Sequence, residues 1–376
     1  MPTLLPPIRL SARSRQTLGE IYDPRRNGLN LLRLLLSAGV IFWHSVPLTG
    51  RTVPWWPAHQ LLGEFWVDGF FAISGYLILG SWISKPRIGR FLLARVLRIA
   101  PGYWACLLVT ILVLAPLGIW LSGSTLPPDY GSSSVQYFLN NFFLRINQYG
   151  IAGTPINVPD PGVWNGSLWT LFWEFCCYLG VLGLGVAGLF RRRWTVLAVF
   201  AGMLLVGILS SSVVHNYYAT RMGRFGLMFA AGALVYRYRH RIPVSGPLIA
   251  GAGAVILLSA LLPNYRLVAA LPIAYLLLCV GALIKRKSLG LHNDISYGAY
   301  VYAFPVQQIL AGTALVALPS VAFGLLSAAL TAPLAIASWF LIEKPGKNLA
   351  HRWRRAPSGP ASVLPVSEAP SPTPSS

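Results

Sequence analysis

Two residues that could do chemistry lie within the first long apolar run of the chain, residues 29–48. Arg33 and His44 are eleven positions apart, and eleven helical steps of about 100° bring them to one face, about 16 Å apart along the axis. A cation and an imidazole are costly in hydrocarbon unless they face protein or a solvated cavity. The pair therefore predicts a polar site inside a membrane protein. Alternatively, Arg33 reaches the cytoplasmic headgroups and His44 lies in the opposite interface.

Carboxylates are scarce enough in this chain to be assigned individually. Among the ten acidic residues, Asp68 lies near the outer end of the second apolar run and Glu174 lies within the fourth. We predict that both share a polar pocket with His44 in the outer half of the membrane. An imidazole titrates near neutrality and can remove a hydroxyl proton, with a carboxylate to orient it. Alternatively, the carboxylates pair with arginines such as Arg221 or Arg224 for packing.

Basic side chains before the third apolar run are suited to holding an anion. Arg95 and Arg98 are three apart and therefore adjacent on one helical surface, where they could bind phosphates. Simple anchoring at the cytoplasmic headgroups explains them equally well. In the second run, Ser74 and Gly75 permit close helix approach, so packing is the first interpretation of that pair.

No spacing of metal ligands occurs, and no metal site is expected. The four cysteines lie in apolar runs and behave as small hydrophobic residues; they are Cys106, Cys176, Cys177 and Cys279.

Composition predicts an all-α polytopic membrane protein, because 55% of the residues are hydrophobic and only 11% are charged. The apolar runs predict about ten transmembrane helices. The formal net charge of +20 comes in short clusters between these runs, which argues against a nucleic-acid partner. The predicted spans are residues 29–48, 65–83, 92–120, 168–190, 194–213, 225–238, 247–262, 267–284, 295–318 and 321–342.

The distribution of lysine and arginine predicts the orientation. With both termini in the cytoplasm, all but six of the 30 basic residues fall on the cytoplasmic side, and Arg33 is one of those six. Residues 1–28 form a cytoplasmic segment without the features of a signal peptide. The membrane domain spans residues 29–345. A tail, residues 346–376, begins basic and ends in a Pro- and Ser-rich stretch that we expect to be disordered.

Six short motifs in order resemble the integral-membrane acyltransferase family 3, whose members acylate hydroxyls of cell-surface glycans and some small molecules. The resemblance covers roughly residues 27–347. Its motifs are Arg33 with His44; residues 67–78; Arg95 and Arg98 before the Pro-Gly-Tyr-Trp of residues 101–104; residues 168–174, ending in Glu174; residues 296–300; and residues 342–345. The chain departs from many members at two places. Phe175 follows Glu174 instead of a second acid, and Ala303 replaces a histidine before Phe304.

The resemblance implies an enzyme of the cell (inner or plasma) membrane. It would transfer an acyl group, most simply acetyl, from acyl-CoA as co-substrate, without a permanently bound cofactor, to a hydroxyl of a polysaccharide or lipid-linked sugar. Arg33, Arg95 and Arg98, with the Ser74-Gly75 motif, would contact the donor. His44 would act as general base, or carry the acyl group, with Glu174 and Asp68 orienting it. The alternatives are a small-molecule O-acyltransferase, of macrolides for example, a transporter or flippase of glycans or lipids, and a scaffold.

Overall fold

The computed structural model describes residues 16–213, 216–285 and 293–355, and these residues fold into helices without a β-sheet. The N-terminal segment before residue 16 and the predicted disordered tail, residues 356–376, lie outside the described residues. The helices are α1 (Leu18–Ile21), α2 (Leu29–His44), α3 (Trp56–His59), α4 (Phe65–Ser84), α5 (Ile88–Val109), α6 (Ala115–Leu121), α7 (Tyr130–Asn141), α8 (Trp169–Val186), α9 (Thr195–Ser212), α10 (Tyr217–Tyr238), α11 (Gly246–Ser259), α12 (Arg266–Leu283), α13 (Ser296–Ala311), α14 (Ser320–Ser338) and α15 (Lys344–Arg355).

Three π-helical turns join some of these helices into longer rods. The turns are Gln60–Glu64 between α3 and α4, Thr110–Leu114 between α5 and α6, and Trp339–Glu343 between α14 and α15. A π-turn inserts an extra residue into the helix and re-aims the side chains that follow, and such turns are frequent at functional sites. The third turn ends on the buried carboxylate Glu343.

Seven helical segments in the described part of the chain are long and apolar enough to cross a membrane. They contain α2, α4, α5, α8, α9, α12 and α14, so the chain is a multi-pass helical membrane protein. Each of the ten predicted ranges overlaps at least one helix, but α10, α11 and α13 do not meet the criterion. Helix α11 has 14 residues and α13 has 16, whereas α10 carries Arg221, Arg224 and Arg237. The count of ten spans therefore stays a prediction.

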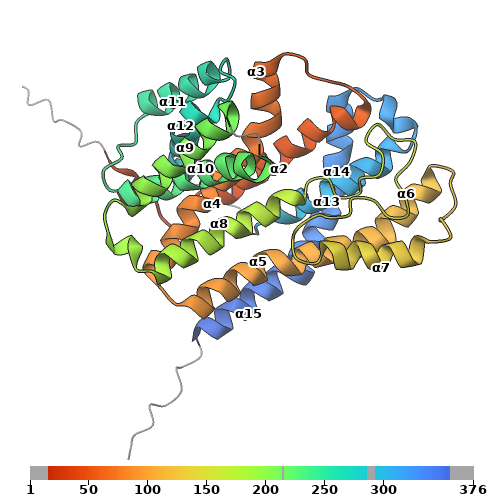
Figure 1. Ribbon diagram of the computed structural model, residues 1–376, viewed down its shortest axis with the longest axis horizontal. Coiled ribbons are helices and arrows are strands. Elements are labelled where there is room, and N and C mark those ends of the chain that lie inside the picture. The colour runs from red at the N-terminus through yellow and green to blue at the C-terminus, as the bar shows by residue number, and fades with distance from the viewer. Residues whose placement is uncertain (1–15, 214–215, 286–292, 356–376) are drawn as a thin grey trace, which may run out of the picture.

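The helices form two groups with a third set between them (Figure 1). Helices α9 to α12 lie together at one side, and α5, α13, α14 and α15 lie at the other, with α2, α4 and α8 between. Helix α13 is buried along all of its residues, so it forms the centre of the second group. The ligand-sized cavity described below lies where the groups meet at α2, α4, α5 and α8.

Helices α4 and α10 pack backbone against backbone through glycines. A Cβ atom at Gly75 would collide with the carbonyl oxygen of Phe229, and one at Gly232 would collide with that of Ala72. Small residues allow this close approach between membrane helices. Gly75 therefore serves helix packing, which was the first interpretation of this residue.

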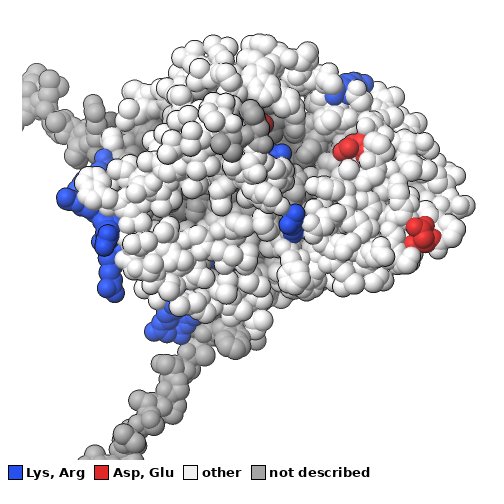
Figure 2. Space-filling model, viewed as in Figure 1, with Lys and Arg blue, Asp and Glu red and all other residues white. Residues whose placement is uncertain are grey.

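Charges are unevenly distributed over the molecular surface. Figure 2 shows Lys and Arg side chains gathered mainly along one edge of the visible face, with acidic side chains toward the opposite end. The orientation was predicted from a clustering of Lys and Arg on one side of the membrane. The side of the membrane on which each terminus lies stays a prediction.

Candidate active site

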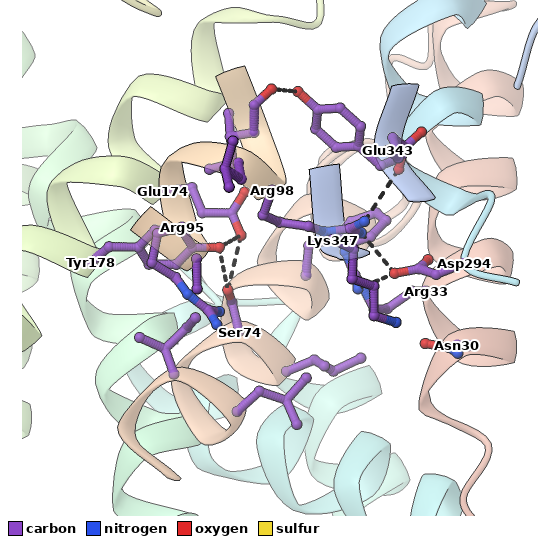
Figure 3. A pocket seen from close by; sticks show the side chains of 18 residues that line it. Asn30, Arg33, Ser74, Arg95, Arg98, Glu174, Tyr178, Asp294, Glu343 and Lys347 are labelled. Carbon is purple, nitrogen blue, oxygen red and sulfur yellow. Dashed lines mark hydrogen bonds and ion pairs between the residues drawn. The ribbon is translucent and has the colours of Figure 1, made fainter. Parts of the chain in front are cut away.

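A cavity of about 340 Å³ lies between α2, α4, α5 and α8, and it is closed on one side by the residues around the start of α13 and by the π-turn before α15. Figure 3 shows charged side chains from these elements converging on it. Its lining residues are Asn30, Arg33, Phe70, Ile73, Ser74, Leu77, Ile78, Ala94, Arg95, Leu97, Arg98, Ile99, Glu174, Tyr178, Asp294, Tyr297, Glu343 and Lys347. All three arginines predicted to contact a donor therefore share one cavity with Ser74 and Glu174.

Two of these arginines are held in place by carboxylates that are distant in sequence. An Nη of Arg33 lies 2.6 Å from Asp294, and the two Nη atoms of Arg98 lie 2.7 Å from Asp294 and 3.2 Å from Glu343. Asp294 also accepts a hydrogen bond from the hydroxyl of Ser296 at 2.5 Å. This network ties α2 and α5 to the residues around α13 and α15, and it fixes where the two guanidinium groups point.

Asp294 remains an anion in this network. Burial alone would raise its pKa, but the guanidinium groups of Arg33 and Arg98 outweigh that effect and hold the pKa well below the usual range for aspartate. Asp294 therefore stays ionised throughout the physiological pH range.

Glu174 belongs to a second cluster on the opposite wall of the cavity. It accepts hydrogen bonds from Ser74 at 2.9 Å and from the hydroxyl of Tyr178 at 2.6 Å. The guanidinium of Arg95 lies 5.9 Å from the centre of the Tyr178 ring, within the range of a cation–π contact. In Figure 3, Arg95, Ser74 and Tyr178 are grouped around Glu174.

A smaller cavity of about 40 Å³ adjoins the first one, and the two share Arg33, Phe70, Glu174 and Tyr297. Tyr300 also lines it, and the rings of Phe70 and Tyr300 contact each other edge to face at 5.9 Å. Phe304 lies one turn beyond Tyr300 on α13, and its ring packs edge to face on the imidazole of His44 at 5.1 Å. Tyr300 and Phe304 therefore lie between the cavities and His44, which lines neither of them.

His44 ends α2 with an unsatisfied polar atom. Its Nδ1 is buried, and among the described residues it has no hydrogen-bond partner. A buried polar atom without a partner is costly, and such an exception calls for an explanation such as a catalytic role or an unseen ligand.

Asp68 lies in a different environment. Its carboxylate is fully buried and pairs with the Nε atoms of Arg224 at 2.9 Å and Arg266 at 2.5 Å, while the hydroxyl of Tyr265 donates to it at 2.6 Å. Arg266 also pairs with Glu64. This network joins α4, α10 and α12, as the packing alternative for Asp68 anticipated.

The expectation that His44, Asp68 and Glu174 share one pocket is therefore wrong. The oxygens of Asp68 are occupied by arginines and a tyrosine, and Glu174 faces the cavity that contains Arg33, at the other end of α2 from His44. Gly75 is absent from the lining of that cavity and packs on α10 instead, so its assignment to the donor site is corrected to helix packing.

Three charged residues of the cavity were not predicted from the sequence: Asp294, Glu343 and Lys347. The signal for them was present, because Asp294 lies two residues before the 296–300 motif and Glu343 lies inside the 342–345 motif. Their proximity to Arg33 and Arg98 depends on contacts between residues about 250 positions apart in sequence. Within the described residues, no group of three or more His, Cys, Asp or Glu side chains is arranged to hold a metal ion.

Comparison with known proteins identifies the family. The profile of the acyltransferase domain, acyltransferase family 3, matches residues 26–340. The chain belongs to this family. It is a membrane-embedded acyltransferase by family membership and by its apolar helices.

Two curated relatives align over most of the acyltransferase. A protein named O-acetyl transferase from Shigella phage Sf6 is 28% identical over 333 residues, covering 85% of this chain and 96% of the relative. A protein named Nodulation protein 10 from Rhizobium leguminosarum bv. viciae is 27% identical over 375 residues, covering 86% and 94%. No solved structure matches the chain.

Proposed function

We propose that this acyltransferase transfers an acetyl group from acyl-CoA to a hydroxyl of a cell-envelope glycan or lipid-linked sugar, in the inner or plasma membrane. The observation that carries the proposal is the convergence of Arg33, Arg95 and Arg98 in one cavity. The name of the phage relative, O-acetyl transferase, supports acetyl as the group and oxygen as the acceptor atom.

The charged part of the cavity is suited to the phosphates of the donor. It contains four basic side chains, including Lys347, and three carboxylates, so it carries one net positive charge when all are ionised. A guanidinium group has five N–H donors, and Arg33 and Arg98 use only one and two of them in their ion pairs. The remaining donors can bind phosphate oxygens, for which arginine has matching geometry.

The smaller cavity is suited to the acyl end of the donor. Its volume of about 40 Å³ is enough for a small acyl group, and Phe70 and Tyr300 line it. A donor whose phosphates lie near Arg98 would direct its thioester toward α13 and His44. The small volume favours acetyl, as does the name of the phage relative.

In the proposed reaction, Nδ1 of His44 accepts the proton of the acceptor hydroxyl. The hydroxyl oxygen forms a bond to the thioester carbonyl carbon, and the carbon–sulfur bond then breaks. The thiolate of CoA leaves and takes the proton from His44, so the products are an O-acetyl ester and free CoA. General-base assistance of this kind contributes about 10²–10⁴-fold.

The test uses the purified full-length protein in proteoliposomes with acetyl-CoA labelled in the acetyl group and an envelope glycan fraction from the host cell. We expect label in the glycan and release of an equal amount of free CoA thiol. Movement of glycan or lipid across the bilayer without consumption of thioester would contradict the proposal and favour a transporter.

A further inference from the structure

An apolar groove of about 270 Å³ lies between α8, α9 and α10. Its lining covers about 10 Å along α9, from Val196 to Met203, and about 16 Å along α10, from Met222 to Ala233. The hydrocarbon core of a bilayer is about 30 Å thick, so the groove has the length of about one leaflet. No charged residue lines it; the other lining residues are Leu79, Cys176, Cys177, Gly180, Val181, Leu184, Phe190, Val199, Gly226, Phe229 and Ala230.

A turn that contains three arginines lies at one end of this groove. Phe190 and Val196 both line the groove, and the arginines at residues 191–193 lie between them in the chain with exposed side chains. The hydroxyl of Thr195 donates to the carbonyl of Leu189 at 2.5 Å, so the turn is short and holds its arginines beside the groove. We call residues 189–195 the arginine turn.

The arginine turn has the features of a segment at the level of the lipid headgroups. Trp194 is exposed, and tryptophan is enriched where a membrane protein passes from hydrocarbon to water. The guanidinium of Arg193 lies 5.1 Å from the centre of the Trp194 ring, within the range of a cation–π contact. The groove therefore begins at a charged interfacial turn and continues into the hydrocarbon region.

No carboxylate neutralises the arginine turn. Within the described residues, none of its three arginines forms an ion pair. The chain has no aspartate or glutamate between Glu174 and Asp294, and these two acids belong to the donor cavity. Arginine side chains near a membrane surface attract anionic lipids, and guanidinium groups match the geometry of phosphate oxygens.

We propose that the groove and the arginine turn bind one anionic phospholipid of the surrounding membrane. One of its hydrocarbon chains lies between α8, α9 and α10, and its phosphate contacts the arginine turn. The groove has the length of one leaflet and its charged end is at headgroup level, which is the arrangement of chain and phosphate in a phospholipid. On the predicted orientation this lipid belongs to the cytoplasmic leaflet.

Helix α8 separates the groove from the donor cavity, which gives the lipid an effect on the reaction. Glu174 and Tyr178 on one face of α8 line the cavity, whereas Cys177 and Val181 on the other face line the groove. A lipid chain supplies packing contacts on the side of α8 that the protein leaves open, and it thereby holds Glu174 beside Ser74. The binding goes beyond the proposed function, and only this effect on transfer rests on it.

The first test fills the groove. A Cβ atom at Gly180 meets no atom within 4 Å, and the same holds for Gly183, which is on α8 but does not line the groove. Binding of phosphatidylglycerol to the full-length protein in detergent is measured by native mass spectrometry. We expect Gly180→Leu to weaken binding about tenfold, because the leucine displaces methylene groups of the lipid chain, and Gly183→Leu to bind as the unchanged protein does. Equal binding by Gly180→Leu would overturn the proposal.

The second test concerns the headgroup, and it decides independently of how Gly180→Leu folds. The unchanged protein should bind phosphatidylglycerol several-fold more tightly than phosphatidylcholine. Arg191→Gln, Arg192→Gln and Arg193→Gln combined should abolish this preference, whereas lysine at the same three positions should keep most of it, because the charge remains. The control, Arg25→Gln combined with Arg26→Gln, removes two exposed arginines outside the groove and should keep the preference. Equal binding of the two lipids by the unchanged protein would contradict an anionic lipid site.

The effect on the reaction is measured as acetyl transfer in vesicles. We expect several-fold faster transfer in vesicles that contain phosphatidylglycerol than in vesicles of phosphatidylcholine alone, and Gly180→Leu should lose this stimulation while Gly183→Leu keeps it. Equal transfer by the unchanged protein in both vesicles would overturn the effect of the lipid on α8. Absence of transfer in both vesicles would count against the proposed function instead, and the binding results would still decide the lipid site.

Discussion

At the scale of single residues, the cavity contains charges that position one another. Asp294 is 7% exposed and lies between the guanidinium groups of Arg33 and Arg98, which would otherwise repel each other across the cavity. Glu343 contacts only the second of these arginines. The donor site proposed here therefore depends on an aspartate that itself need not touch the donor.

This arrangement makes a prediction about pH. The pKa of Asp294 is lowered in the folded protein by Arg33 and Arg98, despite burial. Its ionised form then adds stability that is fully present above its unfolded pKa of about 3.9 and is lost as the pH falls below that value. We expect Asp294→Asn to lower the melting temperature at pH 5–8, with the difference from the unchanged protein shrinking below about pH 4. Thermal unfolding in detergent measures this, and a difference that grew on acidification would contradict it.

His44 carries the prediction for catalysis. His44→Ala should reduce acetyl transfer by about 10²–10⁴-fold, because the base for the acceptor hydroxyl is lost, while the amount of folded protein stays the same. The matched control is His59→Ala, because the Nδ1 atom of His59 is likewise buried without a partner among the described residues, but its ring packs on Trp43 and Trp56 in place of Phe304; this variant should keep its activity. Transfer rates are measured with purified proteins at saturating acetyl-CoA, and near-normal transfer by His44→Ala would refute the assignment.

At the scale of elements, the position of each helix follows from polar contacts as much as from apolar packing. Asp68 joins α4 to α10 through Arg224 and to α12 through Arg266. Inside a membrane, lipid tails compete with apolar contacts between helices, so such hydrogen-bonded pairs have a large share in fixing helix positions.

Asp68→Asn should therefore damage the fold more than the chemistry. Removing one partner of a buried ion pair costs about 3–5 kcal/mol, because it leaves the other charge uncompensated. We expect a lower melting temperature and less folded protein, with near-normal transfer per folded molecule. Glu64→Gln should have a smaller effect, since the side chain of Glu64 is 22% exposed. A stable Asp68→Asn protein without activity would instead restore Asp68 to the catalytic machinery.

The elements also show what could be predicted from the sequence. The apolar runs predicted a helix in each of the ten ranges, because burial in lipid demands a continuous apolar stretch. The spacing of Arg95 and Arg98 predicted that they share one helix face, and both line the cavity. The contacts of these side chains could not be predicted, because the depth of a residue along its helix does not specify which neighbouring helix its side chain faces. Asp68 and Glu174 were therefore placed with His44, whereas Asp68 faces α10 and α12, and Glu174 faces Ser74.

At the scale of the whole molecule, the proposed donor cavity lies among basic segments in the first halves of α2 and α5. The predicted orientation puts these segments on the cytoplasmic side, where a thioester donor is available.

This arrangement requires the predicted orientation, which cysteine labelling can test. Gly89 and Gly131 both have open space where a Cβ atom would be, and they lie at the start of α5 and on α7. With an impermeant thiol reagent on intact cells, Gly131→Cys should be labelled and Gly89→Cys should not, and inverted vesicles should reverse the result. The unchanged protein gives the background of its four native cysteines. Labelling of Gly89→Cys from outside would contradict the orientation.

The most direct measurement of the central claim is a density map of the protein with bound CoA. We expect the phosphates beside Arg33, Arg95 and Arg98 and the sulfur directed along the cavity toward Tyr300, on the side of His44. CoA bound at another place, with this cavity empty, would contradict it.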